Sequence, residues 1–432
     1  MQNLKVWSYI SLPWLAFTIT FFIGFFFLAF FSQLDNTFLT NNYLVTLFLN
    51  TILLSSITAI LSALIAVPLA ILVTFYKFPG HKFFSWGLSL SIAFPAYVYA
   101  FIFVGIFEYS SPISEYLRQI NIVLPSIKNL IGASAIMSMA LFPYIFLLTK
   151  AQLSNVGVNI FKAAKSLGNS DLTAIYKVIF PSLKPAIFAG MALVIFETIA
   201  DFGGVSTLRI ETFTVGIYDA WFGYQSYYSA ARLAGYLLIF VLFIIFISRY
   251  FQTNSNLLAS KTAEIVEKIE LSKFKQFLLT TICIIIFSFI FCIPFLQLIF
   301  WHFDNLEFNL INNLNLLLNS ILIGIFAALV TVFFAISLSL SYRGTNSLRY
   351  IISISSSGYS IPGSVIAAGL LVVFDVIFGT SITLYGIFGL LICLSIRFMT
   401  PAFNYISSSL ENISESSERA LSTKPKNSYK AF

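Results

Sequence analysis

The chain has 432 residues, of which 59% are hydrophobic and only 9% charged, and its formal net charge is +7. Because a soluble domain carries about 25% charged residues, this composition excludes an ordinary soluble protein and indicates a membrane protein with many spans. The basic residues are distributed over many short segments, so the positive charge does not indicate nucleic-acid binding. Cys283, Cys292 and Cys393 lie in apolar runs, and the two histidines, His81 and His302, are far apart, so we expect neither a disulfide framework nor a metal site.

Apolar runs long enough to cross a membrane recur along the whole chain. A crossing helix needs about 20 apolar residues, and we predict ten spans, at roughly 12–32, 48–75, 84–107, 131–150, 186–204, 228–249, 276–300, 318–341, 350–376 and 382–400. The first run is too long for a cleaved signal peptide and no small-residue cleavage site follows it, so we predict a span.

The basic residues predict the orientation of these spans. With the N-terminus in the cytoplasm, all but four of the 24 Lys and Arg residues fall on the cytoplasmic side, and only Arg118, Lys128, Arg209 and Arg232 lie outside. Loops rich in Lys and Arg stay in the cytoplasm. We therefore expect a cytoplasmic N-terminus, and the polar loop 151–185 on the same side.

This loop, between the fourth and fifth spans, is the longest polar insertion of the first half. Its informative residues are Lys162, Ala163, Ala164, Leu167, Gly168 and Pro181. We predict a short helix over residues 158–167, ended by Gly168 in the left-handed conformation that glycine tolerates. Ser170 and its neighbours offer the N-cap of a second helix, which we expect to end at Pro181. The alternative is an ordinary loop with two adjacent alanines by chance.

The spacing of these residues resembles the EAA motif of the membrane subunits of ATP-binding-cassette importers, Glu-Ala-Ala-x3-Gly-x9-Ile-x-Leu-Pro. Lys162 departs from it, because the family usually has Glu there, and Val178 and Phe180 are conservative departures. The resemblance implies that this loop is the surface on which a cytoplasmic ATPase docks.

Two acidic residues, Glu197 and Asp201, lie one helical turn apart near the outer end of the fifth span, directly before Gly203 and Gly204. We expect the glycines to break the helix. Acids at membrane depth are costly and usually face a protein interior or a wet cavity, so one hypothesis is an acidic lining of a cation path, suited to an ion that prefers oxygen ligands. The alternative is structural: one of the acids pairs with an outer arginine and fixes the loop.

Residues 197–206 and 211–221 are also similar to the ETxADFG and TFTxGIY segments of ferric-iron permeases of the FbpB type. The resemblance implies a bacterial inner-membrane permease built from two fused halves of the type I importer fold. It also implies a homodimeric cytoplasmic ABC ATPase and a periplasmic, ferric-iron-binding protein as partners.

The two halves are visible as a repeat. Asn50 opens the second span as Asn319 opens the eighth, and Pro95 matches Pro362. Glu418 and Leu421 follow the tenth span, where a second, decayed docking motif is expected. We therefore predict a first half at 1–250, a cytoplasmic linker at 251–275 with solvated helical charge pairs, and a second half at 276–432. Compared with the twelve spans of two complete halves, we expect this second half to be incomplete.

We therefore expect an all-α transporter subunit with no enzymatic, metal or cofactor site of its own. No GxxxxGK[ST] phosphate loop is present, so ATP is expected to bind the partner subunit. The alternatives are an ion-driven secondary transporter, a permease for thiamine, polyamine or sulfate, or a scaffold that does not transport.

Overall fold

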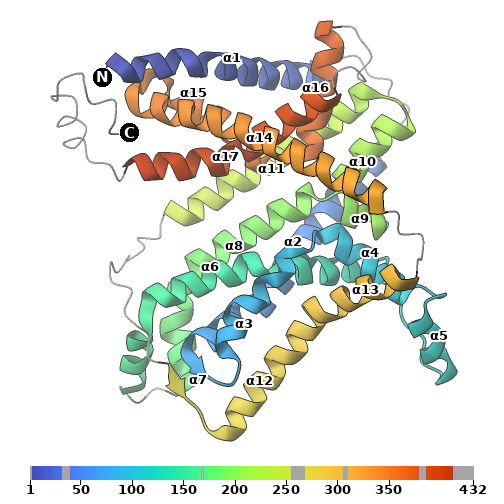
Figure 1. Ribbon diagram of the computed structural model, residues 1–432, viewed down its shortest axis with the longest axis vertical. Helices are drawn as coiled ribbons and strands as arrows, with labels where there is room; N and C mark the ends of the chain where they lie inside the picture. The colour runs from blue at the N-terminus through green and yellow to red at the C-terminus, as the bar shows by residue number, and fades with distance from the viewer. Residues whose placement is uncertain are drawn as a thin grey trace. The chain divides into compact units, whose positions relative to one another are not determined.

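The computed structural model describes residues 2–31, 39–166, 168, 170–253, 268–304, 310–378 and 386–411. Helices account for nearly all of this chain (Figure 1), which confirms the predicted all-α class. The chain forms two compact units. The large unit is Leu34–Phe308, and the small unit combines Met1–Gln33 with Asn309–Phe432.

The large unit contains most of the elements. In chain order they are α2 (Asn41–Phe75), β1 (Tyr76–Lys77), α3 (His81–Gly87), η1 (Leu88–Ala93), α4 (Ala96–Phe107), α5 (Pro112–Gln119), α6 (Leu130–Ser166), α7 (Asp171–Ala174), η2 (Ile175–Ile179), α8 (Phe180–Ala200), α9 (Gly203–Thr207), α10 (Phe213–Tyr218), η3 (Asp219–Gly223), α11 (Tyr227–Thr253), β2 (Ile269–Glu270), α12 (Lys273–Phe287), η4 (Ser288–Cys292) and α13 (Ile293–Asp304).

The core of the large unit is made by α2, α6 and α8, which pack on one another. On α2, the small buried residues Ala59, Ser62 and Ala66 follow one another at helical spacing. Small side chains let helix backbones approach closely, which is a main source of helix association in membranes. Gly190 has the same effect on α8, because a Cβ there would lie 2.7 Å from Cα of Ile145 on α6.

Within the large unit, the long helical run α12–η4–α13 packs on α3 and α4. The hydroxyl of Tyr99 on α4 donates a hydrogen bond of 2.5 Å to the carbonyl of Ile290. Further along α4, Gly105 leaves room for Trp301, whose ring would lie 2.5 Å from a Cβ at that position. A larger residue at Gly105 would therefore separate α13 from α4.

The small unit consists of α1 (Gln2–Phe31), α14 (Leu310–Gly344), η5 (Asn346–Leu348), α15 (Arg349–Ser355), η6 (Gly358–Ser360), α16 (Gly363–Phe378) and α17 (Gly386–Glu411). Hydroxyl pairs join α1 to its neighbours: Ser11 lies 3.1 Å from Ser341, and Thr18 lies 2.8 Å from Ser355. Buried polar pairs of this kind bind helices together in an apolar environment. Ser355, a small residue between helices, thus also contributes a hydrogen bond.

Nine segments among the described residues are long and apolar enough to cross a membrane. In the predicted segment 350–376, the helix is interrupted between Ser355 and Gly363. Thr400 on α17 holds the interruption: its hydroxyl donates to the carbonyl of Ser356 and accepts from the N–H of Tyr359, at 2.6 and 2.9 Å.

The third span of each half is interrupted at its proline. Pro95 stands directly before α4, and Pro362 directly before α16, and each is preceded by a 3-10 helix. Pro68 and Pro143 lie instead inside α2 and α6, which continue through them. Pro95 and Pro362 thus mark breaks in the helix, because proline lacks an N–H and disfavours the helical conformation before it. The matching breaks support the predicted repeat.

The compact units do not follow the order of the chain. α1, from the beginning of the chain, packs on α14, α15 and α16, whereas α12 and α13 pack with α3 and α4. Each predicted half thus contributes its first membrane helix to the compact unit formed by the other half. The division at residues 251–275 rests on the sequence repeat and stays a prediction.

Candidate functional sites at the two ends of α8

Asp201 organises the end of α8 from which α9 begins. One oxygen of its carboxylate, Oδ2, accepts hydrogen bonds from the N–H groups of Gly204 and Val205, at 2.8 and 3.1 Å. These N–H groups belong to the first turn of α9, where a helix has no backbone partner for them. The carbonyl of Asp201 accepts a further bond of 2.7 Å from the hydroxyl of Thr214 on α10. Asp201 therefore joins α8, α9 and α10.

The two glycines that follow are confirmed as the break in the helix, since α8 ends at Ala200 and α9 begins at Gly203. Both are in close contacts. A Cβ at Gly203 would lie 2.7 Å from Cβ of Tyr97 on α4, and one at Gly204 would lie 2.7 Å from Oδ2 of Asp201. A side chain at Gly204 would thus crowd the carboxylate oxygen that its N–H group binds.

Asn50 and Thr51 of α2 fix the segment before α10. The side-chain amide of Asn50 donates to the carbonyl of Glu211 at 3.0 Å, and the hydroxyl of Thr51 accepts from the N–H of Phe213 at 3.2 Å. In the sequence, Asn50 marked only the start of a repeated span. Asn50 and Thr51 are 161 and 162 residues away from their partners in the sequence, so no local sequence pattern could predict these contacts.

The electrostatics of this end favour a structural role for Asp201. Burial raises the pKa of Asp201 to about 6; the hydrogen bonds from Val205 and Gly204 oppose the rise, and the charge of Glu197 adds to it. Among the described residues, no group of three or more His, Cys, Asp and Glu side chains could hold a metal ion. The bonds of Asp201 are those required by the structural alternative, with backbone N–H groups in the place expected for an arginine. A role of Glu197, Asp201, Gly203 and Gly204 in translocation stays a prediction.

At the other end of α8, the predicted short helix over 158–167 is not separate. α6 continues from the fourth span to Ser166 as one helix, so the loop prediction was wrong there. Gly157, the glycine of this stretch, does not end the helix, and the polar residues around it are compatible with a helix. Gly168 has φ of +85°, which confirms the left-handed conformation, and no atom lies within 4 Å of a Cβ built on it.

The chain then re-enters a helix through Ser170. The Ser170 hydroxyl accepts from the N–H of Thr173 at 3.3 Å, which confirms the predicted N-cap of α7. Pro181 does not end the helix: α7 leads through the π-helical turn η2 into α8, and Pro181 lies in the first turn of α8. A proline clashes with the carbonyl four residues before it, and a wider π turn relieves such a clash.

Several residues of the docking motif are described only in part. Lys162, Ala163 and Ala164 lie in the helical backbone of α6. Leu167, Glu418 and Leu421 lie outside the described residues. The site is therefore defined by its backbone, which is a continuous α6, a left-handed turn at Gly168 and a capped α7.

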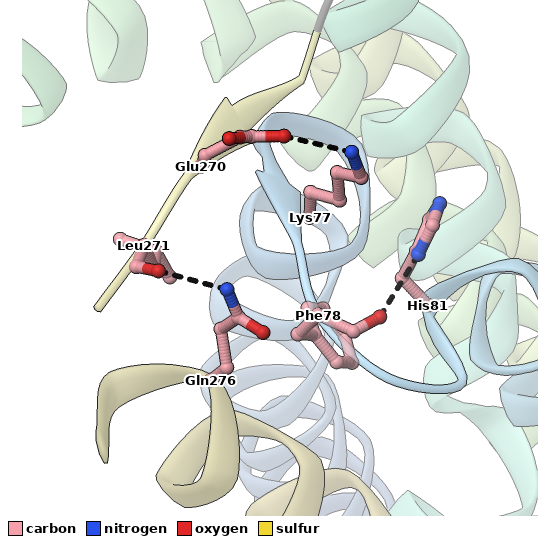
Figure 2. A network of polar contacts seen from close by, with 6 residues as sticks. All are labelled: Lys77, Phe78, His81, Glu270, Leu271 and Gln276. Carbon is pink, nitrogen blue, oxygen red and sulfur yellow. Dashed lines mark hydrogen bonds and ion pairs between the residues drawn. The ribbon is translucent and has the colours of Figure 1, made fainter. Parts of the chain in front are cut away.

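A two-stranded parallel sheet lies at the same end of the large unit, shown in Figure 2. β1 directly follows α2, and β2 lies within the segment 251–275 that we predicted as a linker with helical charge pairs. Tyr76 pairs with Ile269 and Lys77 with Glu270, and the Lys77 ammonium lies 2.7 Å from the Glu270 carboxylate. Within the predicted linker 251–275, residues 268–272 are thus extended and not helical, whereas 251–253 belong to α11 and 273–275 to α12.

Further contacts attach this segment to α2 and α12. The Lys268 ammonium donates to the carbonyl of Val73 at 2.7 Å, and the side-chain amide of Gln276 donates to the carbonyl of Leu271 at 2.8 Å (Figure 2 shows the second bond). Burial lowers the pKa of Lys268, and the charge of Lys150 lowers it further. We call residues 268–272 the strap, because they hold α12 to the end of α2.

Comparison with known proteins agrees with this architecture. Residues 66–256 match the family model of the binding-protein-dependent transport system inner membrane component, a range that contains both ends of α8. The chain is 25% identical over 379 residues to the Fe(3+)-transport system permease protein FbpB 2 of Haemophilus influenzae, which covers 84% of this chain and 70% of that protein. It is 26% identical over 149 residues to the sulfate transport system permease protein CysT of Salmonella typhimurium, covering 34% of this chain and 53% of that protein.

A probable sulfate transport system permease protein of Prototheca wickerhamii is also 26% identical, over 44% of this chain and 76% of its own length. All these relatives are permease proteins of transport systems, and the matched family region includes the break at Gly203 and the left-handed turn at Gly168. Over residues 66–256, the chain is therefore similar to the inner membrane components of binding-protein-dependent transport systems.

Proposed function

We propose that this chain is the membrane subunit of an ATP-driven importer of ferric iron, with its N-terminus in the cytoplasm. The observation that carries the choice of substrate is the extent of the resemblance to the Fe(3+) permease, which covers 84% of the chain, against 34% and 44% for the two sulfate permeases. The dense similarity over 197–221 supports the same choice.

In this proposal a homodimeric ATPase docks on the Gly168 end of the large unit. The continuous helix α6 supports a coupling between the ATPase and the membrane core, because its last turns belong to the same helix that packs on α2 and α8. A force applied near residues 162–168 would be carried along α6 into the core. α8 links this end directly to Asp201 and α9, where a periplasmic, iron-loaded binding protein would deliver its substrate.

The chain itself performs no covalent chemistry in this scheme. Closure of the ATPase would move α6 and α8 together, and the pathway would open alternately to the two sides. Glu197 and Asp201 would lie near the outer mouth of this pathway, with Asp201 holding α9 and α10 in place through the bonds described above.

Uptake by cells tests the proposal. The chain is co-expressed with a candidate ATPase and a candidate ferric-iron-binding protein, in cells that lack their own iron and sulfate importers, and uptake of radiolabelled ferric citrate and sulfate is measured. We expect iron uptake that requires the ATPase. Uptake of sulfate alone would assign the chain to the sulfate permeases. Iron uptake that persists without the ATPase and stops with a protonophore would support an ion-driven transporter.

A further inference from the structure

The large unit contains a cavity of about 880 Å³ between α2, α8 and α12, close to the strap. Its volume lies within the range of about 300–1,000 Å³ that is typical of small-molecule sites. The walls are formed by aliphatic and aromatic side chains, among them Leu64, Ile71, Phe188 and Leu278, and Tyr76 and Leu271 line the strap side. All three helices belong to segments that are long and apolar enough to span a membrane.

Two lysines are the charged residues of the lining. Lys184 lies in the first turns of α8 and Lys275 in the first turn of α12, and both are exposed. Across the part of the chain that the structure describes, the ion pairs are Lys77–Glu270 and Lys128–Glu108, so neither lining lysine has a carboxylate partner there. None of the described residues that line the cavity is acidic.

We propose that this cavity binds an anionic phospholipid from the leaflet on the strap side. The acyl chain would occupy the space beside Leu64 and Phe188, which are 65% and 51% exposed, and the head-group phosphate would lie between Lys184 and Lys275. Lysines near a membrane surface attract anionic lipids, and basic pockets between spans bind their head groups. A zwitterionic lipid in the cavity would neutralise the two ammonium groups less well. An apolar helix of another protein in the same place would leave both ammonium groups without a counter-charge.

This site would make the lipid a structural ligand of the permease. An acyl chain there touches α8, which connects Gly168 to Asp201, and α12, which the strap ties to α2. Occupancy would therefore stabilise the packing of α12 beside α2 and α8. This inference does not depend on the transported substrate or on the ATPase.

Native mass spectrometry of the detergent-solubilised full chain tests the proposal by titration with phosphatidylglycerol and, separately, with phosphatidylcholine. We expect one phosphatidylglycerol to be retained in preference to phosphatidylcholine. The double variant Lys184→Gln/Lys275→Gln should weaken this binding about 30-fold, which is about 2 kcal/mol at 1.4 kcal/mol per tenfold change, for two lysines at about 1 kcal/mol each.

Matched controls distinguish the site from general charge. Lys177 and Lys273 lie on the same two helical runs, are exposed and do not line the cavity, so Lys177→Gln/Lys273→Gln should keep full binding. Ala63→Trp should fill the cavity and reduce the binding of both lipids. Equal retention of phosphatidylglycerol and phosphatidylcholine, or equal loss in both lysine double variants, would overturn the proposal.

Discussion

Asp201 is the residue for which the structure separates two hypotheses most clearly. Its carboxylate caps α9, and loss of a capping oxygen costs about 0.5–2 kcal/mol. We expect Asp201→Ala to lower the thermal unfolding temperature and uptake together, whereas Asp201→Asn keeps an acceptor oxygen and both properties. If Asp201→Asn keeps the unfolding temperature but abolishes uptake, the negative charge itself serves the cation path.

The raised pKa of Asp201 predicts a pH dependence. Because burial raises the folded-state pKa to about 6 from the ordinary 3.8, protonation favours the folded state. This contribution is fully present below pH 3.8 and is lost as the pH rises through about 6. Unfolding temperatures measured across this window should fall more steeply with pH for the parent chain than for Asp201→Asn. Parallel curves for the two proteins would contradict the assignment.

At this scale the sequence predicted the conformations that single residues prefer. Gly168 was expected in the left-handed region and Ser170 as a cap, and both expectations follow from local chemistry. Contacts between distant residues were not predictable. The approach of Gly105 to Trp301, for example, depends on a packing that no local pattern encodes.

At the scale of elements, the strap is the feature that the sequence did not reveal. A strand of two residues has no periodicity, and the polar composition of 251–275 favoured a solvated helix. Pro181 was misinterpreted for a related reason, because the π-helical turn before it depends on the surrounding helices. The long apolar helices, in contrast, were predictable because their length and composition are themselves the signal.

The register of the strap can be tested by cross-linking. Neighbouring strands lie about 4.8 Å apart, and a disulfide needs Cα atoms within about 4.4–6.8 Å of each other. The pair Lys77→Cys/Glu270→Cys should therefore form a disulfide on mild oxidation, seen as a band shift that a reductant reverses. The control pair Lys77→Cys/Ser272→Cys is displaced by two residues and should not. Equal cross-linking of both pairs would contradict the observed register.

At the scale of the whole molecule, the compact units combine distant parts of the chain. α1 belongs to the small unit, and α12 and α13 to the large unit. The repeat predicted the order of the halves along the chain, but a repeat contains no information about which half each helix contacts. The hydroxyl pairs of α1 and the Tyr99–Ile290 bond arise from tertiary packing alone.

This exchange predicts the behaviour of a divided chain. Fragments 1–253 and 254–432 each contain helices of both units, so neither unit can form completely from one fragment. We expect each fragment alone to be degraded in cells, and the two expressed together to co-purify. A fragment 1–253 that is stable and monodisperse on its own would contradict the interdependence of the two halves.

The central claim is that the left-handed turn at Gly168 belongs to the surface on which an ATPase docks. At this φ of +85° most residues are strained by about 1 kcal/mol or more, whereas asparagine tolerates the conformation. Gly223 offers a matched control, because it too has open space around a Cβ but no positive φ.

The most direct measurement is co-purification of the co-expressed ATPase with the Gly168→Asp, Gly168→Asn and Gly223→Asp variants, together with uptake of substrate. We predict that Gly168→Asp inserts normally into the membrane but loses uptake and ATPase association together. Gly168→Asn should keep much of both, and Gly223→Asp should keep the association. Full uptake and full association in Gly168→Asp would contradict the account, because the segment around Gly168 would then be only a connection between α6 and α7.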